Sequence, residues 1–200
     1  MYLGVNPENS AEIERYLDLY TNYGHNLLNH AYGCASIASA LCEAIGVSPN
    51  DKEDIMVASY LHDIGETQLP HRFFTQSQLT DRDKELLNKH PQIGVNLLGE
   101  TINEHTREMI LSHHIDVNGV GYGEGIPDKC GEIVRVADIY TALMSPRIYR
   151  RSYSLFETIS VMDKMADRKH IDKEVWGELR KYLVSCDKSK CKIVRQSNKV

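Results

Sequence analysis

Apolar residues recur every three or four positions along most of this chain, and this spacing limits the possible fold more than any other feature of the sequence. The pattern is clearest over residues 11–45, where it begins with Ile13 and Leu17. Side chains at this spacing share one face of an α-helix. We find no convincing run of alternating apolar and polar residues, which is the pattern typical of a strand. The sequence therefore predicts an all-α fold.

Capping residues, glycines and prolines divide this pattern into separate helices. Ser48 can cap a helix whose first turn contains Pro49, and Ser154 with Glu157 forms the capping-box pattern Ser-x-x-Glu. Four glycines within residues 118–125 indicate a loop. The expected helices span 11–45 (with a break or kink at Gly24 or Gly33), 49–64, 80–89, 92–98, 101–114, 133–144, 154–166 and 172–183.

Length and composition indicate one globular domain. The chain has 200 residues, of which 42% are apolar and 26% charged, and one hydrophobic core can serve a chain of this size. We expect an N-terminal segment over residues 1–9, a helical domain over 10–185 and a polar, basic tail over 186–200. The formal net charge of -5 argues against binding to a DNA or RNA duplex, because duplex-binding domains are usually basic.

The sequence also predicts a cytoplasmic location and no membrane segment. No stretch approaches the roughly 18 apolar residues that a membrane span needs. Residues 1–9 lack the basic start and apolar run of a signal peptide. No two cysteines have CxxC spacing, so we expect reduced thiols. The cysteines are Cys34, Cys42, Cys130, Cys186 and Cys191.

Imidazole and carboxylate groups stand on apolar faces or at helix ends throughout the chain. The adjacent pair His62-Asp63 is weak evidence alone, because a helix-terminal His beside a capping Asp is common. His30 alone can equally be an ordinary core residue. The number of such groups makes a metal site the better explanation. The seven candidate ligands are His30, His62, Asp63, His90, His113, His114 and Asp138.

A metal centre offsets the cost of burying these groups together, because a buried carboxylate is unfavourable unless it is paired or bound to a cation. Imidazole with carboxylate suits Fe and Mn, and also Zn or Ni, while Mg is a further possibility. Seven ligands are too many for one tetrahedral site but suffice for two cations if one carboxylate bridges them. Two cations that share a water carry out phosphoester hydrolysis.

The order of the motifs resembles the HD-GYP branch of the HD phosphohydrolase superfamily, over about His25 to Tyr182. The motifs are His30, His62-Asp63-Ile64-Gly65, His90-Pro91, His113-His114, Gly119-x-Gly121-Tyr122, Val136-Ala137-Asp138 and Arg147-x-Tyr149-Arg150. This resemblance implies a helical bundle of the HD-domain type over residues 10–185. It also implies two metals, usually iron or manganese, and cyclic di-GMP as the substrate.

The resemblance further implies roles for individual residues. One metal is held by His30, His62, Asp63 and Asp138, and the second by His90, His113 and His114, with Asp63 bridging the two. His62, Asp63 and Asp138 are then the catalytic residues. Tyr122 with Gly121 would flank a guanine base, and Arg147 and Arg150 would contact the nucleotide or its phosphates. His25, His71, His105 and His170 have no motif role.

Several positions depart from the family pattern. Glu66 replaces a lysine near the scissile phosphate, where a carboxylate would repel phosphate or add a metal ligand. Asn118 replaces an aspartate and Gly123 a proline in the signature loop. Ile115 stands where a glutamate is usual, and Thr141 where an aspartate is common. Asn26 occupies the position at which three-metal members carry a glutamate, so two metals are expected.

Three hypotheses about function remain. The leading one is a metal-dependent phosphodiesterase that converts cyclic di-GMP to pGpG, GMP or both, with a hydroxide held by the two metals. The second keeps hydrolysis but changes the substrate to another cyclic dinucleotide or a nucleotide. The third is a non-catalytic, metal-binding sensor or module that binds a signalling protein. Metal content, measured together with hydrolysis of a generic bis-phosphoester, separates the third hypothesis from the first two, and the loop over Gly119 to Gly125 with Arg147 and Arg150 separates the second from the first.

Overall fold

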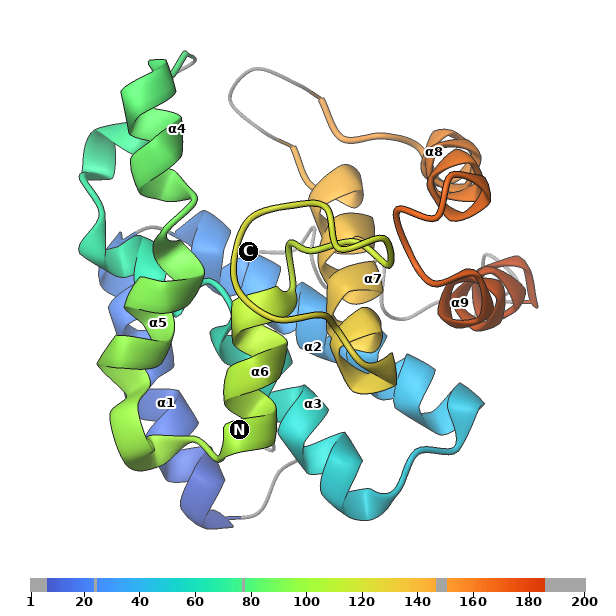
Figure 1. The fold of residues 1–200 in the computed structure, drawn as a ribbon, viewed down its shortest axis with the longest axis horizontal. Coiled ribbons are helices and arrows are strands. Elements are labelled where there is room, and N and C mark those ends of the chain that lie inside the picture. Colours follow the sequence, from blue (N-terminus) through green and yellow to red (C-terminus); the bar gives the residue numbers. More distant parts are fainter. Residues whose placement is uncertain (1–6, 24, 77, 147–150, 186–200) are drawn as a thin grey trace.

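Two long helices, α2 (His25–Ile45) and α7 (Lys129–Met144), pack against each other at the centre of the protein (Figure 1). The computed structural model describes residues 7–23, 25–76, 78–146 and 151–185. The other α-helices are α1 (Pro7–Tyr23), α3 (Pro49–Leu61), α4 (Asp81–Leu87), α5 (His90–Leu98), α6 (Glu104–Ser112), α8 (Leu155–Asp167) and α9 (Lys173–Ser185). Three short 3-10 helices are η1 (Ile64–Gln68), η2 (His71–Phe74) and η3 (Gly99–Thr101).

The remaining helices surround this central pair. Helix α3 packs on both α2 and α7, while α1 covers α2 and α3. Helices α5 and α6 pack against each other on one side, and α8 and α9 form a pair on the other side of α7 (Figure 1). Among the described residues the only β-type pairing is an isolated bridge between Ile115 and Gly121. The all-α prediction is therefore confirmed.

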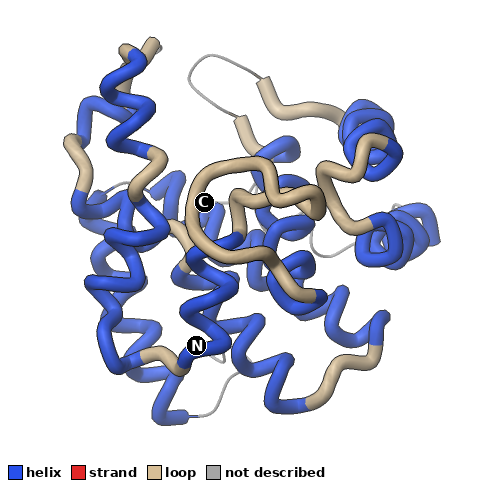
Figure 2. The backbone as a smooth tube through the Cα atoms, viewed as in Figure 1, coloured by secondary structure: helices blue, strands red, loops and turns tan. Residues whose placement is uncertain are grey.

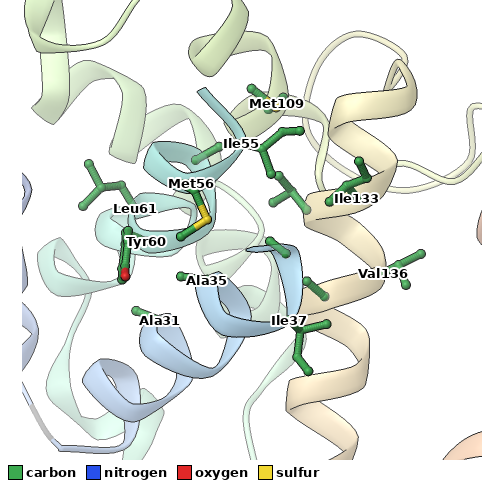
Figure 3. Packing of buried hydrophobic residues seen from close by; sticks show 14 of the residues in the cluster. Ala31, Ala35, Ile37, Ile55, Met56, Tyr60, Leu61, Met109, Ile133 and Val136 are labelled. Carbon is green, nitrogen blue, oxygen red and sulfur yellow. The ribbon is translucent and has the colours of Figure 1, made fainter. Parts of the chain in front are cut away.

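The hydrophobic core lies where α2, α3, α6 and α7 meet (Figure 3). Burying the apolar faces of these helices supplies the main driving force for folding. The close-up labels Ala31, Ala35, Ile37, Ile55, Met56, Tyr60, Leu61, Met109, Ile133 and Val136. Small residues on α2 allow α3 and α7 to approach closely, so the candidate ligands on α2 and α7 lie beside each other.

The predicted caps form as expected. The hydroxyl of Ser48 accepts a hydrogen bond from the Asp51 backbone N–H at the start of α3. Both partners of the Ser154 capping box are present at α8, and Thr80 with Asp83 forms a second box at α4. Each cap satisfies donors that the first turn of a helix leaves unpaired.

The break expected within the stretch 11–45 lies between α1, which ends at Tyr23, and α2, which begins at His25; α2 continues past Gly33, whose added Cβ would lie only 2.6 Å from Cγ2 of Thr141. Other helix boundaries differ from the prediction. Helix α6 begins after Asn103, whose side chain accepts a hydrogen bond from the Thr106 N–H. Helix α7 begins four residues early, because Asp128 caps it through the Gly131 N–H.

A long loop connects α6 to α7 and folds back over the end of α6 (Figure 2). The Glu124 N–H donates to the Leu111 carbonyl, which holds the loop against the helix. Gly123 has a φ of +117°, a value that side-chain-bearing residues rarely adopt. None of the helices in the described ranges is long and apolar enough to cross a bilayer.

Candidate metal centre

The seven candidate ligands lie at helix ends or on the inner faces of the two central helices. His30 belongs to α2 and Asp138 to α7, while the others stand where α3, α5 and α6 begin or end. The structure brings all seven into two adjacent groups, and within each group the potential ligand atoms lie within 4.8 Å of one another. One group contains His30, Cys34, His62 and Asp138, and the other contains Asp63, His90, His113 and His114.

Asp63 lies between the two groups and presents one carboxylate oxygen to each. Its Oδ2 atom lies 3.3 Å from Nε2 of His62 and 3.6 Å from Nε2 of His30. Its Oδ1 atom lies 3.2 Å from Nε2 of His90 and 3.7 Å from Nε2 of His113. The two groups thus share one carboxylate, which is the arrangement that a ligand bridging two cations needs.

Contacts within each group are equally close. In the first group, Nε2 of His30 lies 3.0 Å from Oδ1 of Asp138 and joins α2 to α7. In the second, the Nε2 atoms of His90 and His113 lie 3.3 Å apart. Two nitrogens facing each other at this distance cannot both donate, so at least one presents a lone pair.

Backbone carbonyls orient three of the histidine rings. In each, Nδ1 lies within hydrogen-bond distance of the carbonyl oxygen three positions earlier and donates to it when the ring is neutral. The distances are 3.1 Å from His62 to Ser59, 2.9 Å from His90 to Leu87 and 2.6 Å from His113 to Ile110. Donation from Nδ1 leaves a lone pair on Nε2, and this is the tautomer that binds a metal.

His62 provides the clearest sign that the site accepts a cation. Its side chain is fully buried, and within the described part of the chain its Nε2 atom has no hydrogen-bond partner. The nearby oxygen of Asp63 does not form a well-aligned hydrogen bond with it. A buried nitrogen left unsatisfied costs about 1–3 kcal/mol, unless something else satisfies it. The donor set therefore fits a divalent cation.

The charges around these groups favour a positive charge at the centre. Burial alone would lower the pKa of His62, but Asp63 and Asp138 outweigh burial and raise it to about 9. Burial opposes ionisation of Asp63, but His62, His113 and His90 hold the pKa of this carboxyl well below its usual range. A bound cation would supply the same positive charge, with the histidines then neutral.

The second group contains histidines of opposite tendency. Burial opposes the charged form of His90, but the carboxylates of Asp63 and Glu66 outweigh it and raise the pKa of His90. Burial, followed by the neighbouring His113, lowers the pKa of His114 to about 2. His114 is therefore a neutral imidazole at physiological pH and can act as a ligand without first losing a proton.

Tyr122 faces the second group, as a role in binding beside the metals requires. Its ring centroid lies 4.4 Å from that of His114, with an interplanar angle of 34°, and 6.0 Å from that of His90. One face of the tyrosine ring is thus covered by His114. Gly121 has a φ of +152°, and an added Cβ would lie 2.0 Å from the His114 carbonyl oxygen. Only glycine lets the loop approach His114 so closely.

The remaining substrate-binding candidates are Glu66, Arg147 and Arg150. Glu66 lies in η1, and its charge reaches His90 and Tyr122. It adds negative charge to the site and is absent from both ligand groups. Arg147 and Arg150 lie outside the described residues, so their contact with a nucleotide stays a prediction.

Sequence reasoning missed three residues that shape the site. Cys34, one helical turn after His30, belongs to the first ligand group. Arg135 is buried, and its Nη1 donates to the His113 carbonyl at 2.8 Å. Asp116 is also buried and accepts hydrogen bonds from the backbone N–H groups of the loop. An arginine inside the apolar run of α7 was the one available signal for Arg135.

Three of the departures from the family pattern have a structural reason. Ile115 is buried and forms the bridge with Gly121, so a charged residue there would lose its solvent. The Asn118 side chain donates to the Lys169 carbonyl at 2.9 Å. Gly123 has a positive φ that proline cannot adopt.

Comparison with known proteins gives a consistent picture. A model of the HD domain family matches residues 11–175. The cyclic di-GMP phosphodiesterase response regulator RpfG of Xanthomonas campestris pv. campestris is 31% identical over 128 residues, which are 60% of this chain and 34% of RpfG. The cyclic di-GMP phosphodiesterase of Thermotoga maritima is 27% identical over 164 residues, which are 78% of this chain and 43% of that protein.

A solved structure shares the fold. The HD domain of the L. monocytogenes phosphodiesterase PgpH, in complex with cyclic-di-AMP, has a TM-score of 0.59 and 17% sequence identity, covering 91% of this chain and 93% of that chain. By contrast, this chain spans well under half the length of the two curated relatives that it matches.

Proposed function

The chain belongs to the HD domain family, and from this premise we propose that it is a metal-dependent phosphodiesterase that acts on cyclic di-GMP. The family match and the relatives confirm the resemblance to the HD-GYP branch and the fold that it implies. The activity and the substrate are proposals, because the curated relatives are much longer than this chain.

One observation supports this proposal most strongly: the single carboxylate of Asp63 faces two groups of ligands at once. A structural metal site needs one closed set of about four ligands. Here two sets of ligands lie side by side, and each contains histidines whose Nε2 atoms face a carboxylate. Phosphoester hydrolases use paired cations to bind both the attacking and the leaving oxygen.

We assign the two metal positions as follows. His30, His62, Asp63 and Asp138 would hold one divalent cation, while His90, His113, His114 and Asp63, which faces both groups, would hold the other. Iron or manganese suits these ligands best, with zinc, nickel or magnesium as alternatives. When bound, such a pair lowers the pKa of a water and neutralises charge on phosphoryl oxygens.

The protein itself orients the ligands and offers a surface for a base. The carbonyls before His62, His90 and His113 hold the rings in the metal-binding tautomer, so little reorganisation is needed. Arg135 holds the backbone of His113 in place through the hydrogen bond that its Nη1 donates to the His113 carbonyl. Tyr122 provides an aromatic edge beside the second group, against which a base can pack.

A second candidate function is hydrolysis of a different cyclic dinucleotide. Glu66 favours this alternative, because it adds negative charge where a cation would assist binding of a phosphate. A substrate with a different base or linkage can present its phosphates farther from this carboxylate. The two functions share one metal centre and differ in the contacts that Glu66 and the glycine-rich loop make with the substrate.

The test is to purify the chain without oxygen, measure its metal content and chromatograph the products. Cyclic di-GMP, cyclic di-AMP and a mixed cyclic dinucleotide are supplied in parallel with bis(p-nitrophenyl) phosphate. Two metals per chain with pGpG or GMP as product supports the proposal. Cleavage of another dinucleotide alone favours the second function. Metal without turnover of any ester favours a non-catalytic binding module.

A further inference from the structure

We propose that Tyr23, His71 and Phe74 form an aromatic cluster that binds the second base of the substrate beside the metal centre. This inference rests on the function proposed above and concerns how that site holds its substrate. A cyclic dinucleotide carries two bases, whereas Tyr122 provides a ring for only one of them. Aromatic side chains bind bases of any kind by stacking, because every base has a flat π-face.

The three rings of the aromatic cluster meet where the end of α1 contacts η2. The ring centroid of Tyr23 lies 5.5 Å from that of Phe74, with an interplanar angle of 80°. It lies 5.6 Å from the ring centroid of His71, with an interplanar angle of 58°. These are edge-to-face and tilted arrangements, in which neither partner lies flat on the tyrosine ring.

The aromatic cluster is open to solvent, unlike a group of rings that only packs two elements together. His71 is exposed, while Tyr23 and Phe74 are half-buried. The neighbouring Phe73 is only 6% exposed and already supplies an apolar anchor for η2. The exposed parts of the aromatic cluster are therefore available to a flat apolar ligand.

Helix α1 places the aromatic cluster beside the metal centre. This helix packs on η1, the 3-10 helix that directly follows Asp63. On α1 the fully buried Tyr20 has its pKa raised by burial and then by the nearby charges of Asp63 and Glu66. Tyr23 follows three residues later on the same helix face, and burial and then Glu66 raise its pKa. The two tyrosines thus lead from the metal centre outward.

Glu66 connects the aromatic cluster with the side of the site that carries Tyr122. Its N–H donates to the Asp63 carbonyl at 2.9 Å, so it stands one turn of η1 beyond that ligand. After burial and other carboxylates, its charge also acts on the pKa values of His90 and Tyr122. In Figure 1 the segment before α4 lies at the left and the glycine-rich loop in the middle, with α5 between them.

Two aromatic surfaces beside one metal centre suit a ligand that has a base on each side of its phosphodiester ring. Tyr122 would pack against one base and the aromatic cluster against the other. A ligand with a single base, such as GMP, can use either surface. It should therefore lose little affinity when one surface is removed, whereas a cyclic dinucleotide should lose affinity with either.

The first test measures binding of a non-hydrolysable phosphorothioate analogue of cyclic di-GMP to the metal-loaded chain by titration calorimetry. Tyr23→Ala should weaken binding by roughly 5- to 150-fold, the effect of losing one base–aromatic stack. Tyr23→Phe keeps the ring and should bind as the wild type does. Phe156→Ala is the matched control, because it removes an aromatic side chain that is 82% exposed on α8, and its affinity should not change. Metal content should be the same in all variants.

A second test uses the wild-type chain alone, so it does not depend on the folding of a variant. Cyclic di-GMP that carries 8-azidoguanine is bound to the metal-loaded chain and photolysed, and the labelled peptides are identified by mass spectrometry. We expect labels in the glycine-rich loop and also at Tyr23 or within residues 71–74.

The outcomes distinguish this inference from the proposed function. Labelling that is confined to the glycine-rich loop overturns the role of the aromatic cluster. A Tyr23→Ala variant that is folded by circular dichroism and binds the analogue as tightly as the wild type does the same. Both results leave the metal centre and its activity intact. A wild-type chain that holds metal but neither binds nor cleaves any cyclic dinucleotide overturns the proposed function and this inference with it.

Discussion

The Nδ1 atom of His170 lies 2.9 Å from Oδ2 of Asp116, and this contact joins the turn between α8 and α9 to the base of the glycine-rich loop. The other oxygen of Asp116 accepts hydrogen bonds from the N–H groups of Asn118 and Val120, both at 2.9 Å. A single carboxylate thus fixes the start of the loop that carries Tyr122.

Replacing this carboxylate should loosen the loop without removing metal. In Asp116→Ala the N–H groups of Asn118 and Val120 lose their acceptor, so stability should fall by about 1–3 kcal/mol. KM for the cyclic dinucleotide should rise because Tyr122 is no longer held in place. Thermal unfolding, metal analysis and steady-state kinetics measure these effects. Asp116→Asn keeps one acceptor oxygen, so its stability and KM should lie between those of the wild type and Asp116→Ala. Loss of metal from either variant would contradict this prediction.

Asp63 should be the position most sensitive to substitution. Asp63→Asn keeps the shape of the side chain but removes the charge that both ligand groups share. Activity should fall by more than the roughly 10–100-fold that altering an outer partner of a ligand costs. Metal analysis should show fewer than two ions per chain. A variant with full metal content and normal turnover would exclude a bridging role.

Tyr122 should affect substrate binding more than chemistry. Tyr122→Ala removes the ring beside His114, so KM for a cyclic dinucleotide should rise by roughly 5- to 150-fold, which corresponds to the roughly 1–3 kcal/mol of one base–aromatic stack. Hydrolysis of bis(p-nitrophenyl) phosphate should change little. Tyr122→Phe keeps the ring and serves as the control. Equal losses on both substrates would make Tyr122 a packing residue for His114.

Restoring the family's proline at Gly123 should destabilise the loop. Gly123 has a φ of +117°, and an added Cβ would lie 2.2 Å from the Leu111 carbonyl oxygen. Gly123→Pro and Gly123→Ala should each cost roughly 1–3 kcal/mol. Gly177→Ala is the matched control, because nothing lies near its added Cβ within α9, and it should be neutral or stabilising by up to about 1 kcal/mol. Denaturant unfolding measures the free energy of unfolding of these three variants against the wild type.

His105 should make stability depend on pH. Its Nε2 lies 3.0 Å from Asp128 and its Nδ1 3.2 Å from Asp54, which links α3, α6 and the start of α7. Burial lowers its pKa, but these two carboxylates outweigh burial and raise it. A raised folded-state pKa stabilises the fold below the unfolded value near 6.5, and the effect is lost as pH rises through the folded-state value.

The measurement is the difference in melting temperature between wild type and His105→Asn, followed from pH 5.5 to 9. The difference should be largest at the acidic end and shrink as pH rises. A difference that stays constant across this range would show that His105 contributes by packing alone.

Local signals in the sequence predicted local structure well. The caps at Ser48 and Ser154 depend only on residues within one turn, so their patterns were sufficient. The cap at Asp128 follows a proline in a loop and lacks an acidic partner three residues later, so α7 was predicted to begin too late. Asn103 also lacks an acidic partner three residues later, and α6 was predicted to begin too early, at residue 101.

The residues of the candidate site could be predicted from the sequence, whereas their division into two groups was expected only from the family resemblance. The seven imidazole and carboxylate groups stood out because such groups rarely interrupt apolar faces. Their division into two groups depends on how α2, α3, α5, α6 and α7 pack, which no local spacing encodes. Cys34 was read as an ordinary thiol, and His105 and His170 as ordinary histidines, because their partners are distant in sequence.

The histidines that donate to backbone carbonyls have a consequence for how the chain can vary. The carbonyl oxygen that receives each ring proton belongs to the main chain at residues 59, 87 and 110, so it is supplied whichever amino acid stands there. Substitutions at those three positions can alter packing without changing which imidazole nitrogen is exposed to the centre. Substitutions at these neighbouring positions therefore leave the metal-binding nitrogen of each histidine unchanged, as long as the helical turn persists.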